Sequence, residues 1–160
     1  MRFFWILLLL MILSTVLCGD ELLFRSNEMG MPLERIQDYR RDEFTYVLSV
    51  DKEEDTEISR LYTDGEITKK WEKKRGETGL EEKHYEDGEL SSINKYDDNS
   101  LLLEEISYLE GEVSERRVYV YVQGLLKEIV LFNENDQKVW STRFSRSSFP
   151  EIALQKGHSD

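Results

Sequence analysis

Cysteine, proline and histidine are scarce in this 160-residue chain, which contains one cysteine, two prolines and two histidines. Cys18 alone cannot close a disulfide within the chain, so packing and strand pairing must hold the fold together. A metal site needs three or four converging ligands, and neither His84 nor His158 has a cysteine or histidine partner at ligand spacing. We therefore expect surface histidines, no metal and no cofactor.

Motifs of enzyme active sites are also missing from the sequence. It has no strained serine turn of the hydrolase type and no glycine-rich phosphate loop before a helix. The acidic clusters at 97–99 and 133–136 lack the residue spacing of the known calcium loop, and Asn and Asp favour turns. The sequence therefore predicts a protein that is not an enzyme. A hydrolase assembled from residues far apart in the sequence is a weaker alternative.

Positive charge is in short supply, since 33 acidic residues face 21 basic ones and the formal net charge is −12. An acidic surface repels the phosphate backbone of nucleic acids and the headgroups of anionic lipids. We therefore expect no nucleic-acid partner.

Residues 1–18 have the layout of a secretory signal peptide. A basic start at Arg2 precedes an uninterrupted apolar run from Phe3 to Leu13, followed by smaller residues. A retained membrane anchor is the alternative, since the apolar run to Cys18 is near the lower limit for spanning a bilayer. The segment predicts an exported protein, located in the periplasm, in the cell envelope or outside the cell.

Cys18 lies where processing of this segment would occur. The segment resembles a bacterial lipoprotein signal, which would make Cys18 a lipidation site, although Leu17 departs from that motif. Ordinary cleavage after Cys18 or Gly19 is the other interpretation. Contact with a membrane is expected only if Cys18 is lipidated or the signal segment is retained.

Turn-forming residues recur along the rest of the chain at intervals of 11, 12, 11, 12, 13 and 11 residues. Regular turn signals at this spacing are typical of an antiparallel all-β meander. Asp64-Gly65 and Asp87-Gly88 accept the two positive φ angles of a type I′ hairpin, and Asp98-Asn99 does so less comfortably. The predicted repeat-turn residues are Gly65, Gly76, Gly88, Asn99, Gly111, Gly124 and Asn135.

An aromatic residue stands three positions before most of these turn residues, and an apolar residue follows two positions after. The repeat aromatics are Tyr62, Tyr85, Tyr96, Tyr108, Tyr121 and Phe132. We expect each aromatic to close one strand and to pack across the hairpin on the apolar residue that opens the next. Two positions deviate from the pattern. After Phe132 and Asn135 the apolar residue comes late, at Val139, and before Gly76 the aromatic position is occupied by Lys73.

These signals predict an all-β antiparallel meander of about nine short strands in an open, elongated or curled sheet. The strands are expected at 44–50, 57–62, 67–73, 80–86, 90–96, 101–109, 113–121, 125–132 and 138–144. Residues 19–43 would be either weakly structured or a short helix, for which Pro32 to Tyr39 is the candidate. Residues 44–144 would form the repeat domain, and residues 145–160 would be a mobile tail. The apolar strands from Leu101 onward should form the main core, with 125–132 covered on both faces. The basic strand around Lys69–Arg75 and the acidic one beside it should form cross-strand ion pairs.

The run from Leu61 to Phe144 resembles the bacterial variant of the MORN repeat, which carries a Tyr-x-x-Gly-x-apolar unit. Tyr85-Glu86 and Tyr96-Asp97 are also similar to the tyrosine–aspartate repeats of large secreted toxins. The resemblance covers about half of the chain. It implies an elongated antiparallel β-array and no catalytic residues.

The leading functional hypothesis is an exported structural or protein-binding module whose partner is another protein or an envelope component. The alternative is a periplasmic carrier that holds an apolar ligand in a curled half-barrel. Exposed edge strands would also allow oligomers to form. An immunity or antitoxin role follows only from the family resemblance.

Overall fold

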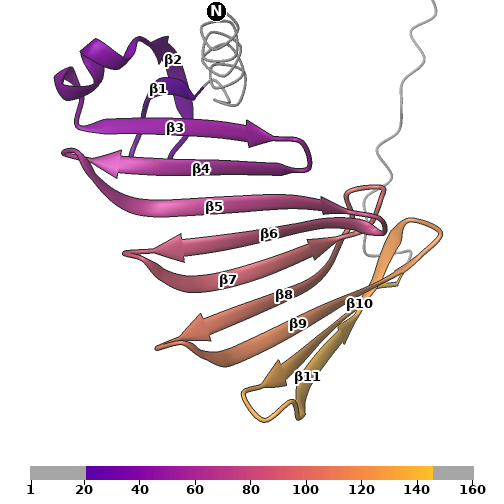
Figure 1. Ribbon diagram of the computed structural model, residues 1–160. Coiled ribbons are helices and arrows are strands. Elements are labelled where there is room, and N and C mark those ends of the chain that lie inside the picture. The colour runs from indigo at the N-terminus through magenta and orange to yellow at the C-terminus, as the bar shows by residue number, and fades with distance from the viewer. Residues whose placement is uncertain (1–20, 146–160) are drawn as a thin grey trace, which may run out of the picture.

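The computed structural model describes residues 21–145, which form one antiparallel sheet of eleven strands (Figure 1). The order across the sheet is β11-β10-β9-β8-β7-β6-β5-β4-β3-β1-β2, so β2 and β11 are its two edges and the sheet is not closed. Strong twist turns β10 and β11 to a steep angle relative to β3 and β4. The predicted signal peptide, Cys18 and residues 146–160 of the predicted tail lie outside the described residues.

The strands are β1 (Leu22–Ser26), β2 (Pro32–Ile36), β3 (Tyr46–Glu53), β4 (Thr56–Thr63), β5 (Glu66–Gly76), β6 (Gly79–Glu86), β7 (Glu89–Tyr96), β8 (Leu102–Leu109), β9 (Glu112–Val122), β10 (Leu125–Asn133) and β11 (Lys138–Arg143). A short 3-10 helix, η1 (Asp38–Glu43), joins β2 to β3. The predicted meander is confirmed, and the nine predicted strands are β3 to β11 with ends within three residues of those expected.

The prediction for residues 19–43 is wrong, because this segment contains two strands and Pro32–Ile36 is extended rather than helical. β1 pairs with both β2 and β3, and Leu23 lies opposite Ile36 and Ser49. Leu23 and Ile36 are buried together with Val47, and Phe44 and Tyr62 pack against them. This long-range burial outweighs the weak local pattern of the segment.

Among residues 21–145, the turns and the short helix near the N-terminus cover parts of both faces of the sheet at β3 to β5. The face that carries Val47 and Tyr62 is called the Val47 face, and the opposite face, with Leu48 and Leu61, the Leu48 face. The Arg41 guanidinium, in η1, lies 3.9 Å from the centre of the Tyr62 ring. Gly30, in the β1–β2 turn, approaches Trp71 so closely that an added methyl group would lie 2.8 Å from Cη2 of the ring.

The buried apolar residues all come from the N-terminal strands, namely Leu23, Ile36, Val47, Leu48 and Leu61. None of residues 62–145 is buried, so the predicted core from Leu101 onward and the two-sided burial of 125–132 are both wrong. The described chain places no second layer of strands or helices over β5 to β11. Apolar side chains of β5 to β11 lie beside those of the neighbouring strands and remain half-buried or exposed on both faces of the sheet.

Lateral contacts between charged side chains accompany this one-layer arrangement. Lys73 Nζ lies 3.4 Å from Glu82 Oε1, and Lys69 Nζ lies 3.7 Å from Glu86 Oε1. These contacts confirm the predicted ion pairs between the basic strand β5 and the acidic strand β6. Pairs of this exposure contribute up to about 1 kcal/mol each, so strand pairing and side-chain packing supply most of the stability.

Candidate functional site

Tight turns join the hairpins where the sequence predicts type I′ geometry. Asp64 and Gly65 have φ angles of 50° and 88°, and Asp87 and Gly88 have 50° and 84°. Both positions of each pair are therefore in the left-handed region, as predicted. The same geometry recurs at Glu110-Gly111 and Gln123-Gly124.

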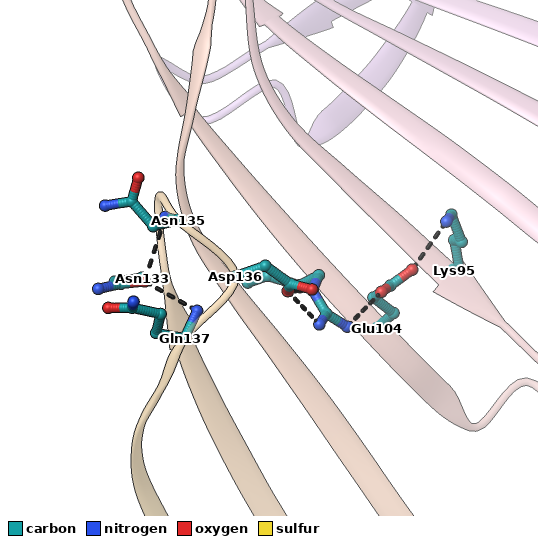
Figure 2. Close-up of polar contacts among 7 residues, drawn as sticks. Lys95, Glu104, Asn133, Asn135, Asp136 and Gln137 are labelled. Atoms are coloured by element: carbon teal, nitrogen blue, oxygen red, sulfur yellow. Dashed lines mark hydrogen bonds and ion pairs between the residues drawn. The ribbon is translucent and has the colours of Figure 1, made fainter.

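The asparagine turns differ from the prediction, because the positive φ falls one residue later, at Ser100 (63°) and Asp136 (57°), rather than at Asn99 and Asn135. In these wider turns the first residue accepts two backbone hydrogen bonds. Asp97 Oδ1 accepts from the amides of Asn99 at 2.9 Å and Leu101 at 2.8 Å. In the other turn, Asn133 Oδ1 accepts from the amides of Asn135 at 3.1 Å and Gln137 at 2.9 Å (Figure 2).

Gly76 is not a turn glycine, because it is the last residue of β5 and lies opposite Gly79 in the ladder. The residue with special geometry is Gly79, whose φ is 144°. A methyl group at Gly79 would lie 2.0 Å from the backbone oxygen of Tyr96. The sequence signal that could have identified it is the second glycine, three positions after the first.

Each repeat aromatic lies beside a shift in strand register, where one residue is extra on the outgoing strand. Tyr62 pairs with Ile67, Tyr85 with Leu90, Tyr108 with Val113 and Tyr121 with Leu126, as predicted. Tyr96 instead pairs with Leu102, and Phe132 with Lys138. The motif therefore encodes a β-bulge beside the turn, which increases local twist.

Three of the extra residues carry hydroxyl groups, and they are spaced 23 residues apart: Thr68, Ser91 and Ser114. Each donates to the carbonyl oxygen of the residue that precedes the aromatic, at 3.4, 3.1 and 3.2 Å in that order. The true repeat is thus a two-strand unit of 23 residues, and the hydroxyl satisfies a carbonyl at the bulge.

The repeat aromatics form two rows on opposite faces of the sheet. Tyr62, Tyr85, Tyr108 and Phe132 lie on the Val47 face, at the end of the sheet where Gly65, Gly88 and Gly111 turn the chain. Tyr96 and Tyr121 lie on the Leu48 face at the other end. Successive turns are at opposite ends, so the aromatics cannot form one continuous platform.

Cationic side chains lie over three of the four repeat aromatic rings on the Val47 face. Arg41 covers Tyr62, the Lys70 ammonium lies 4.2 Å from the centre of the Tyr85 ring, and the Arg116 guanidinium lies 4.1 Å from that of Phe132. These contacts contribute about 0.5–1 kcal/mol each at exposed sites. The row therefore has a structural role within the chain.

A group of ionisable side chains on the Leu48 face surrounds Glu82. Its carboxylate lies 3.4 Å from Lys73 Nζ and 3.4 Å from His84 Nε2, and it accepts a hydrogen bond from Tyr96 Oη at 3.4 Å. The His84 contact is the main reason that the pKa of Glu82 is lowered, and Lys73 adds to it against the effect of partial burial. A carboxylate held in its charged form by a hydrogen-bonding histidine and a lysine acts as an ion-pair partner rather than as a general acid.

A chain of polar contacts crosses four elements on the Val47 face (Figure 2). Lys95 Nζ, from β7, lies 2.7 Å from Glu104 Oε2 of β8, and Arg116 Nη1 of β9 lies 3.2 Å from Glu104 Oε1. Arg116 Nε also donates to Asp136 Oδ1 in the β10–β11 turn at 3.0 Å. Burial raises the pKa of Glu104, but Lys95 and Arg116 outweigh it and lower the pKa overall. The chain fixes the last hairpin to the rest of the sheet.

Beyond this chain of contacts the Val47 face presents an exposed apolar patch, here called the Val122 patch: Val120, Val122 and Leu125. Their exposed fractions are 40%, 51% and 47%. Val122 pairs directly with Leu125, and Val120 lies on the same face because side chains alternate along β9. Sequence reasoning identified the strand from its valine and tyrosine run but not its exposure.

Charge is distributed unevenly between the two parts of the sheet. Residues 21–111 contain 25 acidic and 13 basic side chains, whereas residues 112–143, which span β9 to β11, contain five of each. The Val122 patch therefore lies on the electrically neutral end of an acidic protein.

Within residues 21–145 no group of three or more His, Cys, Asp or Glu side chains is arranged to hold a metal ion. No helix in the same residues is long and apolar enough to cross a membrane. Comparisons of the chain with protein-family models, with curated proteins and with solved structures give no match.

Proposed function

We propose that the chain is an exported β-repeat protein of the cell envelope or the extracellular space, and that it binds another protein through the Val122 patch. The observation that carries the proposal is an open one-layer sheet whose exposed apolar patch lies on its neutral end. A protein that binds at this patch contacts the neutral part of the sheet. It therefore avoids most of the repulsion that the acidic part exerts on acidic partners. The signal-like segment at residues 1–18 supports export.

The kinship with MORN-type repeats stays a prediction, and the 23-residue unit supports it. The carrier alternative has no specific observation in its favour among the described residues. Apolar side chains are spread over both faces of β9 to β11, including Val122 on the Val47 face and Trp140 on the Leu48 face. Native mass spectrometry of the purified protein checks this alternative, because a carrier would retain a bound lipid.

The binding proposal is tested by capture from a cell-envelope extract with the tagged, exported protein. We expect one specific partner, and we expect Val122→Glu and Leu125→Glu to abolish its recovery, because a carboxylate in the patch must be desolvated on binding. Leu109→Glu is the matched control, since Leu109 is 69% exposed and lies at the opposite end of the sheet. Recovery of no specific partner, or equal recovery by all variants, would contradict the proposal.

Export is tested separately by cell fractionation of the same tagged chain. We expect the mature protein in the periplasmic, membrane or extracellular fraction, with residues 1–18 removed or with Cys18 lipidated. Accumulation of the full-length chain in the cytoplasm would refute the localisation without affecting the binding test.

A further inference from the structure

The two edges of the described sheet differ in how they are protected. β2 has five residues and begins with Pro32, which has no amide to donate. β11 has six residues and no proline, and its Val139 and Trp140 are 55% and 50% exposed. A strand of this kind at an edge is a template for a further strand.

The backbone of β11 determines which amides are available to such a strand. The amide of Phe144 donates to the carbonyl oxygen of Lys127 at 2.8 Å, so the amides of residue 142 and of residue 140 also face β10. By the alternation of an antiparallel ladder, Ser141 and Arg143 direct their amides away from β10, whereas Val139 is the extra residue of the bulge opposite Phe132, where the alternation is interrupted. Within the described sheet, the side of β11 that faces away from β10 therefore offers donors and acceptors at Ser141 and Arg143.

We propose that β11 pairs antiparallel with β11 of a second copy of this chain, around a two-fold axis at Thr142. Only a register with an outward-facing residue opposite another outward-facing residue completes the ladder, which requires the axis to pass through a residue rather than between two. With the axis at Thr142, the Thr142 side chains of the two copies lie opposite each other on the Leu48 face. Ser141 then lies opposite Arg143 of the second copy, so like charges are not opposed.

The charge distribution favours a contact between the β11 edges of two copies over a head-to-tail contact between β11 of one copy and β2 of the next. Two copies that meet at β11 bring together the neutral ends of the sheet, with five acidic and five basic side chains in residues 112–143. A head-to-tail contact would place β11 on the Pro32 edge, next to the acidic part of the chain, and would repeat without closing. The two-fold contact closes as a dimer and buries the exposed Trp140 of each copy.

The experiment is sedimentation velocity of the exported protein over a range of concentrations, under reducing conditions so that a lone cysteine cannot link two chains. We expect a concentration-dependent doubling of mass that strengthens with salt, because salt screens the repulsion between two acidic chains. Ser141→Pro removes an outward amide and should abolish the dimer, whereas Ser141→Ala keeps that amide and should leave it intact. If Ser141→Pro does not fold, Trp140→Lys provides the same test.

Each result decides the proposal. A monomer at all concentrations, a dimer that survives both Ser141→Pro and Trp140→Lys, or a ladder of increasing masses would overturn it. The inference does not depend on the proposed function, because Val122→Glu should leave the dimer intact and Ser141→Pro should leave partner capture intact. If β11 binds a different protein instead of a second copy, Ser141→Pro should abolish capture of that partner. This result would also overturn the dimer proposal.

Discussion

Alanine substitutions at three glycines provide a sharp test of the turn geometry, because the structure assigns each a different outcome. Gly79 has φ 144°, and an added methyl group would lie 2.0 Å from the backbone oxygen of Tyr96 and 3.1 Å from its carbonyl carbon. Backbone strain at such an angle costs about 1–3 kcal/mol, and forced overpacking about 1–3 kcal/mol more. We expect Gly79→Ala to lower the free energy of unfolding by about 3–5 kcal/mol.

The two comparison variants should both lose less stability than Gly79→Ala. Gly88 has φ 84° but no neighbouring atom within 4 Å of an added methyl group, so Gly88→Ala should cost only the left-handed conformation, about 1–2 kcal/mol. Gly76 has no positive φ, and the nearest atom to an added methyl group is the oxygen of Gly79 at 3.8 Å. Gly76→Ala should stabilise by about 0.4–1 kcal/mol, because alanine restricts the unfolded chain.

Urea unfolding followed by tryptophan fluorescence and circular dichroism measures all three variants against the parent protein. The slopes with urea should stay equal, so that the shift in midpoint reports stability alone. If Gly79→Ala loses no more stability than Gly88→Ala, the close approach of β6 to the backbone of Tyr96 is wrong. If Gly76→Ala destabilises like Gly88→Ala, Gly76 is a turn residue after all.

Arg116→Met should lower the free energy of unfolding by about 1–2 kcal/mol in urea, because it removes a partly buried ion pair with Glu104 and a cation–ring contact; a loss that high salt does not reduce would contradict this. The pKa values of Glu82 and Glu104 are lowered by folding, so their contribution is complete above about pH 4.5 and is lost as the pH falls below it; thermal unfolding that stays unchanged from pH 6 to pH 3 would refute the assignment. Gly30→Ala combines φ 78° with a contact to Trp71 and should cost about 1–3 kcal/mol with a change in tryptophan emission, whereas an unchanged spectrum would argue against that contact.

The sequence predicts the strands and tight turns well because their signals are local. Asp64-Gly65 and Asp87-Gly88 favour one turn geometry whatever surrounds them, and they set the positions of the strands on each side. The pairing of Tyr85 with Leu90 follows from the same short spacing. Local chemistry therefore accounts for the meander and for most aromatic pairs.

Layering and burial could not be predicted in this way. The apolar strands after Leu101 have the composition of a core, but no second layer covers them within the described chain, whereas Leu23 and Ile36 become buried through contacts between distant strands. The face on which Tyr96 or Tyr121 lies depends on each extra residue at a bulge, since a shift of one residue reverses the face. The special geometry of Gly79 likewise results from a strand 17 residues away.

The 23-residue spacing of Thr68, Ser91 and Ser114 restricts how a chain of this kind can change in length. Gain or loss of a whole hairpin returns the chain to the same end of the sheet, and every later tyrosine keeps its side. Gain or loss of a single strand would exchange the two sides for all that follows and move the tyrosines away from the cations that cover them. Only a change by an even number of strands therefore preserves the arrangement of tyrosines and cations in this architecture.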